Sequence, residues 1–392
     1  MEEDLEQIKN NIKKYISNSK IFKISEELID IEVTKIGGYS NMNYRAVIKN
    51  KTKNEIIDQI FYRKFGSKFG ALSESVNHEI ESSITKYLAE KGYGPKLLYE
   101  ISDDCSITEF LTDTITLPFE KCLNKNIIES LSNMLNYFTL ISYSYRYNIE
   151  GENLSIIPIE DINNGKKINV TKNHYQKYVV DIYEKTKSSF KIFSDEFIKK
   201  YSKEKNSKEW ADFELVQDFI NNFTKLFNEN FNTKGFLVLN HNDVFRFNIL
   251  FREKDEKIFL VDHEYFSLNL PGYDIAYYLV EYFIQYEPEY KMALNDVDFD
   301  KIYSSYETFI DIFIQEHKFF EKEEGRKEFI EMIKSYNYFI KLINIINLSL
   351  FVWSIGNVKF ENWDAEHKKE FFFVHGLDRI KFYLAGIKAM SK

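Results

Sequence analysis

The chain is poor in cysteine and has fewer basic than acidic side chains, and both features narrow what the protein can be. Only two cysteines, Cys105 and Cys122, occur among the 392 residues. Their spacing suits no metal site. Because cysteine is so scarce, we expect a protein of a reducing compartment. The formal net charge is −9, which disfavours a general nucleic-acid partner because phosphate backbones bind basic surfaces.

Apolar segments that target or anchor a chain are also missing. The first ten residues, MEEDLEQIKN, are acidic and contain no apolar stretch of a secretory signal. Residues 338–358 are long and apolar, but polar side chains such as Lys341 and Asn344 interrupt them, and a membrane-spanning helix tolerates few of these. We therefore expect a buried helix there, no integral membrane segment and a cytoplasmic protein.

The segment 239–274 organises the rest of the chain. Two short apolar stretches, 249–251 and 258–261, flank the polar turn REKDEK and predict a β-hairpin. Asp243 and Asn248 precede the first strand, and Asp262 follows the second. A hairpin brings these ends together, so two carboxylates and one amide oxygen would share a small space. Such oxygen ligands suit Mg²⁺, which takes one or two carboxylates plus substrate phosphates.

The order of these residues resembles the catalytic segment of choline/ethanolamine kinases, in the aminoglycoside-phosphotransferase branch of the protein-kinase-like fold. The matching motifs are H-N-D at 241–243, an Asn five residues later, D-x-E-Y at 262–265 and P-G-Y-D-I at 271–275. The resemblance implies that Asp243 is the catalytic base, that Asn248 and Asp262 bind Mg²⁺, and that Asp274 braces the catalytic loop. Residues 245–247 and His263 depart from the family pattern.

Residues 1–115 are expected to bind ATP. Strands at 29–36 and 44–48 flank Gly-Gly-Tyr-Ser-Asn at 37–41, a turn whose backbone N–H groups can cover phosphates. In the strand at 59–65, Arg63 and Lys64 point to opposite faces. Resemblance to the family motifs G-G-x-[ST]-N and L-x-R-x-[YF]-G implies that Arg63 holds ATP phosphates. Glu81, with Glu79 as runner-up, would pair with Arg63 from a helix over 72–90. Strands at 97–99 and 105–110 would lead into a hinge that meets adenine. The nucleotide-binding residues implied by the resemblance are Gly38, Ser40, Asn41, Arg63, Glu81, Glu109, Phe110 and Leu111.

The acceptor site is expected from three later parts of the chain, the predicted helices at 275–286 and 338–355 and the segment of His375. The family carries a carboxylate near the substrate cation, here Glu281, and aromatic rings around it. Trp353 matches the second Trp of the family motif W-x-x-W-[AS]-[IL], but Leu350 replaces the first, and His375 stands where a Tyr is usual. The substrate-binding residues implied by the resemblance are Glu281, Tyr286, Trp353 and His375.

The predicted fold is a two-lobed, protein-kinase-like α+β chain. Residues 1–115 form an ATP-binding lobe of antiparallel sheet plus helix, and residues 116–392 form a larger, mainly helical lobe that carries the catalytic and substrate residues. Helices are expected near 126–143, 174–200, 213–228, 275–286 and 338–355, with loops at 151–173 and 201–210. An amphipathic helix over 3–19 either packs on the body of the protein or supports a homodimer.

The predicted function is Mg²⁺- and ATP-dependent phosphorylation of a small amino alcohol for phospholipid synthesis. Aromatic abundance favours choline slightly over ethanolamine, because a quaternary ammonium binds aromatic faces. Two alternatives stay open at this point. One is another small-molecule kinase of the same fold, acting on an aminoglycoside, thiamine or a sugar-like alcohol, and the other is a catalytically inactive kinase-like binding protein.

Overall fold

A computed structural model gives the fold of most of the chain. The chain divides into two compact units: the first comprises residues 1–114 and 259–264, and the second comprises residues 115–258 and 265–392. The segment 259–264 therefore joins the first unit from far along the chain. The residues that the structure describes are 2–19, 26–37, 42–65, 78–101, 105–143, 153–156, 168–171, short pieces between 175 and 198, 205–231, 237–283, 298–315, 323–356 and 365–390.

The first unit is built on a five-stranded antiparallel sheet. Its strand order is β1-β2-β3-β5-β4, and every neighbouring pair is antiparallel. The predicted strands of this region are all present. Their bounds are β1 Ile29–Gly37, β2 Met42–Asn50, β3 Ile56–Lys64, β4 Leu97–Ile101 and β5 Cys105–Glu109.

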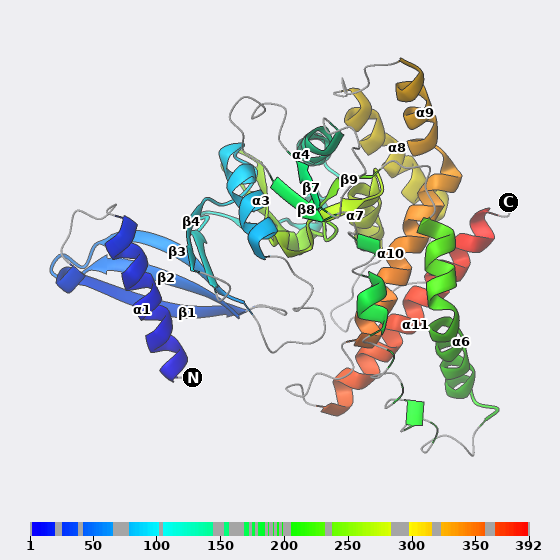
Figure 1. Cartoon of the computed structure of the whole chain (residues 1–392), viewed down its shortest axis with the longest axis horizontal. Helices are drawn as coiled ribbons and strands as arrows, with labels where there is room; N and C mark the ends of the chain where they lie inside the picture. The colour runs from blue at the N-terminus through cyan, green and yellow to red at the C-terminus, as the bar shows by residue number, and fades with distance from the viewer. Residues whose placement is uncertain are drawn as a thin grey trace. The chain divides into compact units, whose positions relative to one another are not determined.

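One face of this sheet is covered by the N-terminal helix α1, Glu2–Ser19 (Figure 1). Ile8, Ile12 and Ile16 recur every four residues, which places them on one side of the helix. All three are buried in a cluster that includes Tyr44 and Ile60 of the sheet. The predicted amphipathic helix is confirmed, and its apolar side is used for packing within the first unit.

Helix α3, His78–Glu90, also belongs to the first unit. After it the chain turns at Gly92, whose φ of 74° is the left-handed conformation that favours glycine. Gly94 then passes close to the late segment: a Cβ on it would lie 3.3 Å from the Leu260 carbonyl oxygen. The Leu260 N–H donates to the Tyr93 carbonyl at 2.8 Å. The turn after α3 is therefore where residues 259–264 are attached.

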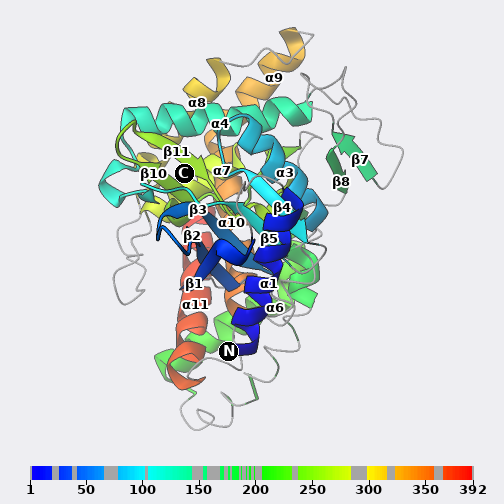
Figure 2. The ribbon, with the colours of Figure 1, turned by 90° about the vertical axis from the view of Figure 1, so that its left-hand side faces the viewer.

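The second unit is mainly helical, as predicted. Helices α10 and α11 lie side by side in both ribbon views (Figures 1 and 2). Helix α10 is buried along most of its length, and its Asn347 and Ser349 side chains bond to carbonyls one turn earlier. No helix in the described part of the chain is long and apolar enough to span a bilayer. The helix bounds are α4 Lys125–Tyr143, α6 Lys208–Phe231, α7 Tyr273–Phe283, α8 Phe299–Gln315, α9 Glu323–Ile333, α10 Tyr336–Gly356 and α11 Ala365–Met390.

Short strands frame the segment 239–274. The predicted hairpin is present as β10, Ile249–Arg252, and β11, Lys257–Leu260, with β6, Ile115–Thr116, hydrogen-bonded on the other side of β10. Strand β9, Val238–Asn240, pairs antiparallel with β12, Ser267–Asn269. These two pairings hold the polar residues between β9 and β10.

Two loop predictions were too long. Within 151–173, Asn153–Ile156 and Ile168–Thr171 pair as the antiparallel strands β7 and β8, because both segments alternate polar and apolar residues. The loop predicted at 201–210 ends early, because α6 already begins at Lys208, one residue after Ser207, whose hydroxyl caps the Trp210 N–H.

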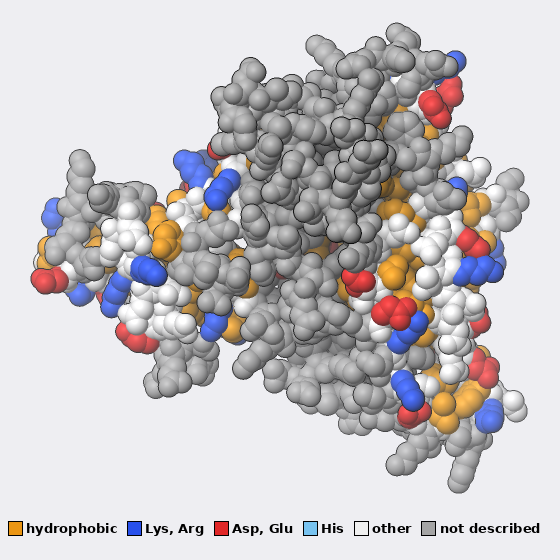
Figure 3. Space-filling view, viewed as in Figure 1, with side chains coloured by type: hydrophobic (Ala, Val, Ile, Leu, Met, Phe, Trp, Pro, Cys, Tyr) orange, Lys and Arg blue, Asp and Glu red, His pale blue; other side chains and the backbone are white. Residues whose placement is uncertain are grey.

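Charged side chains are interspersed on the described part of the surface seen in Figure 3, where Lys and Arg alternate with Asp and Glu. Mixed signs of this kind keep a surface soluble without forming a strong field of one sign.

Candidate active site

The loop after β9 holds Asp243 through the residue before it. Asn242 adopts a φ of 67°, a left-handed conformation that Asn tolerates better than most residues. Its side-chain Nδ2 donates to the Tyr265 carbonyl at 2.7 Å and to Ser267 Oγ at 2.9 Å, while its Oδ1 accepts from Asn269 Nδ2 at 2.8 Å. The backbone leading into Asp243 is thereby fixed to β12.

Asp274 fixes the same loop from the start of α7. Its two carboxylate oxygens accept the backbone N–H groups of His241 and Asn242 at 2.7 and 2.8 Å. The predicted brace is therefore present. Burial raises the pKa of Asp274 to about 7, although both N–H bonds act to lower it.

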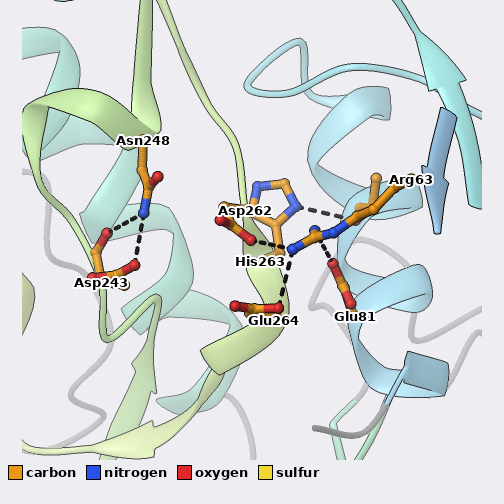
Figure 4. Close-up of polar contacts among 8 residues, drawn as sticks. Arg63, Glu81, Asp243, Asn248, Asp262, His263 and Glu264 are labelled. Carbon is orange, nitrogen blue, oxygen red and sulfur yellow. Dashed lines mark hydrogen bonds and ion pairs between the residues drawn. The ribbon is translucent and has the colours of Figure 1, made fainter. Parts of the chain in front are cut away.

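Asp243 itself is held by both of its carboxylate oxygens. Asn248, at the end of the 3₁₀ turn η5 (Arg246–Asn248), donates from Nδ2 to Asp243 Oδ2 at 2.8 Å and to its carbonyl at 3.0 Å (Figure 4). Tyr277 of α7 donates its hydroxyl to Asp243 Oδ1 at 2.9 Å. Because the Asn248 nitrogen binds Asp243, its amide oxygen is turned away and is the atom that could bind a cation.

In the first unit, the guanidinium of Arg63 gathers three carboxylates. Nη1 donates to Glu81 at 2.7 Å, and Nη2 donates to Asp262 at 2.5 Å and to Glu264 at 3.0 Å (Figure 4). The Arg63 side chain is only 10% exposed. Burial acts to lower its pKa, but Asp262, Glu81 and Glu264 outweigh that and raise it. One positive and three negative charges leave the cluster with an acidic surplus.

Asp262 is held in this cluster by its neighbours in sequence. It has a φ of 68°, and the turn η6, His263–Tyr265, begins directly after it. The Leu260 carbonyl can only accept, so His263 Nε2, 3.0 Å away, carries the proton and Nδ1 accepts from Thr85 Oγ1 at 3.0 Å. Thr85 and Glu81 lie one turn apart on α3, so one face of this helix holds both Arg63 and the segment of Asp262.

The predicted hinge follows β5, and much of its backbone is already used. The Glu109 N–H donates to the Lys96 carbonyl at 2.8 Å, and the Phe110 N–H donates to the Gln59 carbonyl at 3.3 Å. Neither is available to adenine without a rearrangement. Within the described residues, the Leu111 N–H has no such acceptor, so it is the candidate donor among the three hinge residues.

Three of the four residues predicted to bind the substrate form one network in the second unit. Glu281 Oε1 lies 2.9 Å from Nη2 of Arg379, whose side chain is fully buried. The same nitrogen lies 3.4 Å from His375 Nε2, and the ring of Trp353 lies 6.2 Å from the His375 ring. Burial, with a smaller effect of Arg379, keeps the pKa of His375 well below its usual value.

The tautomer of His375 follows from its partners. Ser354 Oγ donates to the Leu350 carbonyl at 2.7 Å, so it accepts from His375 Nδ1, which lies 2.5 Å away. His375 Nε2 is then the acceptor for Arg379. The residue that replaces the usual Tyr is thus a neutral imidazole in a chain of hydrogen bonds that ends on Glu281.

Other predicted residues stand apart or lie outside the description. Gly38, Ser40, Asn41 and Tyr286 are not among the described residues. Asp262 belongs to the first unit, whereas Asp243 and Asn248 belong to the second, so their convergence around Mg²⁺ stays a prediction. No group of three or more His, Cys, Asp or Glu side chains suited to a metal occurs in the described segments. The donors still fit Mg²⁺ chemically, because the Asn248 oxygen and the acidic Asp262 cluster are hard oxygen ligands.

Some residues of these networks were not predicted from the sequence to be partners of the site residues. Glu264 was noted only as a family match, yet it shares Arg63 with Glu81 and Asp262. Tyr277 lies three residues after Asp274 on a predicted helix, and this spacing could have placed it against the same loop. Arg379 lies four residues after His375, so helical spacing also relates these two side chains.

The sheet-and-helix unit and the braced loop define a protein-kinase-like fold. The structure resembles a choline kinase from Cryptosporidium parvum, with TM-score 0.63 and 18% identity, over 99% of this chain and 96% of that one. It also resembles an ethanolamine kinase from Plasmodium vivax, with TM-score 0.57 and 17% identity, over 97% and 90% of the two chains.

Sequence comparison gives the family. The model of the family described as choline/ethanolamine kinase matches residues 33–384, so the chain belongs to that family. A probable ethanolamine kinase from Arabidopsis thaliana is 22% identical over 260 residues. That alignment covers 66% of this chain but only 58% of the plant protein, which is less than two thirds of its length.

Proposed function

We propose that the protein transfers the γ-phosphoryl group of ATP to the hydroxyl of a small amino alcohol, choline first and ethanolamine second. The observation that carries this proposal is the fixed orientation of the Asp243 carboxylate. Its carboxylate is oriented by Asn248 and Tyr277 on a loop that Asp274 braces, in a chain of the choline/ethanolamine kinase family.

The chemistry asked of the protein is mainly positioning. The alcohol oxygen forms a bond to the γ-phosphorus, the bond from that phosphorus to the ADP oxygen breaks, and the hydroxyl proton passes to Asp243. Phosphoryl transfer of this kind depends on alignment and on electrostatic stabilisation rather than on covalent chemistry by the enzyme. Arg63, oriented by Glu81, is proposed to face the phosphates of ATP.

Asn248 and Asp262 would hold Mg²⁺ through an amide oxygen and a carboxylate. When bound, the ion supplies positive charge that offsets the charge of the phosphates. Asp262 is one third exposed and already carries the positive Arg63 on Oδ1. The contacts to Arg63 and Thr85 hold the Asp262 segment in place, which prepares this ligand before the nucleotide binds.

Choline is proposed as the acceptor because Trp353 offers an aromatic ring next to His375, which is linked through Arg379 to the Glu281 carboxylate. Cation–π contacts suit a trimethylammonium group, which has no N–H to donate. One observation favours ethanolamine as the second candidate. His375 stands where the family usually has a Tyr ring, and both of its ring nitrogens are already bound by Ser354 and Arg379, so a quaternary ammonium would find fewer aromatic faces here, whereas a primary ammonium depends less on rings.

The test is a phosphate-transfer screen with Mg²⁺ and ATP over choline, ethanolamine and the two methylated intermediates, with thiamine and an aminoglycoside as comparison substrates. We expect the highest kcat/KM for choline, and we expect all four amino alcohols to be turned over faster than the two comparison substrates. Asp243→Asn should lower kcat by orders of magnitude and leave ATP binding nearly unchanged. A wild-type preference for thiamine or the aminoglycoside, or near-native turnover by Asp243→Asn, would overturn the proposal.

A further inference from the structure

Tyr277 reaches Asp243 from a different element than Asn248 does. It lies on α7, three residues after Asp274, so the residue that braces the loop backbone and the residue that meets the Asp243 side chain share one helix face. Tyr277 is 5% exposed. Its hydroxyl lies 2.9 Å from Asp243 Oδ1.

The direction of this hydrogen bond is settled by charge and burial. A carboxylate only accepts, so the Tyr277 hydroxyl donates. Burial, followed by the negative charge of Asp243, keeps the pKa of Tyr277 well above its usual value, so the donor stays protonated. The ring is packed beside Tyr273, with 6.0 Å between ring centres, and Tyr273 in turn bonds to the Tyr175 hydroxyl at 2.6 Å.

The two donors together fix a torsion that is otherwise soft. Rotation of a carboxylate about its Cβ–Cγ bond is broad and roughly two-fold. Asn248 holds Oδ2 from η5 and Tyr277 holds Oδ1 from α7. With both oxygens held from two different elements, the carboxylate keeps one orientation in which it can meet a substrate hydroxyl.

We propose that Tyr277 is a positioning residue for the phosphoryl acceptor. Resting on the proposed function, its hydroxyl aims the Asp243 carboxylate at the alcohol. The same helix carries Glu281 one turn later, and Glu281 belongs to the Arg379 network of the proposed cation site. Helix α7 thus orients the group that meets the hydroxyl end of the acceptor and a group that faces its ammonium end.

The first test compares Tyr277→Phe with Tyr278→Phe. Tyr278 is the matched control, because it is buried on the same helix and its hydroxyl donates to the Cys122 carbonyl at 2.8 Å, away from Asp243. Each change removes one buried hydroxyl and keeps the ring. We expect kcat to fall about 10- to 100-fold in Tyr277→Phe, the order expected when a reacting group is misplaced. KM for ATP should change less than about two-fold, since Tyr277 acts on the alcohol side, and Tyr278→Phe should keep wild-type kcat.

The second test repeats Tyr277→Phe in the Asp243→Asn background. If the hydroxyl acts through the carboxylate, its loss should lower the residual kcat by less than about two-fold there, a strong non-additivity. Equal losses in both backgrounds would mean a structural role and overturn the inference. So would unchanged kcat in Tyr277→Phe while the wild type phosphorylates an amino alcohol. A wild type that phosphorylates none of the amino alcohols would overturn the proposed function as well, so the two failures can be told apart.

Discussion

Arg63 shows how much a single buried side chain determines in the first unit. Its guanidinium is bound by Glu81 from α3 and by Asp262 and Glu264 from the late segment. Lysine could not replace it well, because only the planar fork of arginine presents several donors in fixed directions. The residue proposed to face ATP phosphates is therefore also the residue that holds Asp262.

The first prediction concerns this cluster. Arg63→Met should lower the free energy of unfolding by about 3–5 kcal/mol, because it leaves buried carboxylates without their counter-charge. The side chains of Glu81 and Glu264 are 9% and 3% exposed. Urea unfolding measures the loss. Arg45→Met is the control, since Arg45 on β2 bonds to the neutral Gln59 and its loss leaves no carboxylate without a counter-charge. A loss no larger than that of the control would contradict the prediction.

The second prediction concerns the metal. Asp262→Ala and Asn248→Ala should each shift the Mg²⁺ concentration for half-maximal activity upward, because each removes one of few protein ligands. Asp255→Ala is the control, as Asp255 pairs with Arg252 on an exposed turn. The readout is a Mg²⁺ titration at fixed ATP. An unchanged titration in both variants would place the ion elsewhere.

The third prediction concerns Trp353. Trp353→Ala should lower kcat/KM for choline by about 3- to 30-fold, the size of one cation–π contact of roughly 0.5–2 kcal/mol. The loss for ethanolamine should be smaller, and KM for ATP should stay near the wild-type value. Steady-state kinetics with both alcohols decides. If kcat/KM for both alcohols is unchanged in Trp353→Ala, Trp353 is not part of the site. A wild-type preference for ethanolamine of about ten-fold in kcat/KM would reverse the proposed order of the two substrates.

At the scale of single residues, the sequence predicted which residues belong to the site better than it predicted their hydrogen-bond and ion-pair partners. Asp274 was placed under the catalytic loop and Arg63 beside Glu81, and both contacts are present. Glu264 was missed as a partner of Arg63 because a long-range hydrogen bond leaves no local pattern. Tyr277 was missed although its spacing from Asp274 points to the same loop. The neutral form of His375 was also out of reach, since it depends on burial and on Arg379.

Helix α7 is the element that does most to organise the second unit around its loop. All residues from Tyr273 to Val280 are buried, so the helix cannot shift without repacking its surroundings. Asp274 and Tyr277 meet the loop from it, and Glu281 meets Arg379. Substitutions of Asp274, Tyr277 or Glu281 on α7 should therefore affect turnover more than substitutions on an exposed helix.

The fourth prediction is the pH dependence that Asp274 adds to stability. Its pKa is about 7 in the folded protein, above the value near 3.9 of an exposed Asp. The folded state therefore binds more protons between these values. The contribution of Asp274 is fully present below about pH 4 and is lost as the pH rises through 7, by at most about 1.4 kcal/mol per pH unit.

The measurement compares the wild type with Asp274→Asn by urea unfolding from pH 4 to 8. The difference between the two removes the opposite effect of His375, whose lowered pKa costs stability as the pH falls below about 6.5. Asn offers one acceptor oxygen to two N–H groups, so the variant should also be less stable. A difference that stays constant with pH would show that Asp274 does not titrate in this range.

Elements with a clear period were predicted well, and short paired strands were not. The spacing of Ile8, Ile12 and Ile16 was enough to predict α1. The strands β7 and β8 are only four residues long and lie in a polar stretch, so their alternation of polar and apolar residues is a weak signal. Their pairing with each other is not visible in either segment alone.

At the scale of the whole molecule, the fold class was accessible because several weak motifs agreed. No single motif, from Gly-Gly-Tyr-Ser-Asn at 37–41 to the tryptophan motif at Trp353, would have sufficed. Their order along the chain matched one family, and the family model covers residues 33–384. The division of the chain into two units was harder to predict from the sequence. The boundary beside residue 115 is visible in sequence, but nothing local marks 259–264 as part of the first unit.

That late segment means that the first unit is not a continuous cassette. Its Asp262 and Glu264 side chains bind Arg63. Leu260 bonds to the turn after α3, and His263 bonds to Thr85 on α3 itself. We expect a fragment of residues 1–114 to unfold at lower urea than the same fragment joined by a linker to residues 259–264, with an Asp262→Asn, Glu264→Gln version of the fusion as control. Equal midpoints would contradict this. Recombination between homologues should accordingly succeed only when residues 259–264 travel with the N-terminal segment, so the ancestry of the two pieces is expected to be shared.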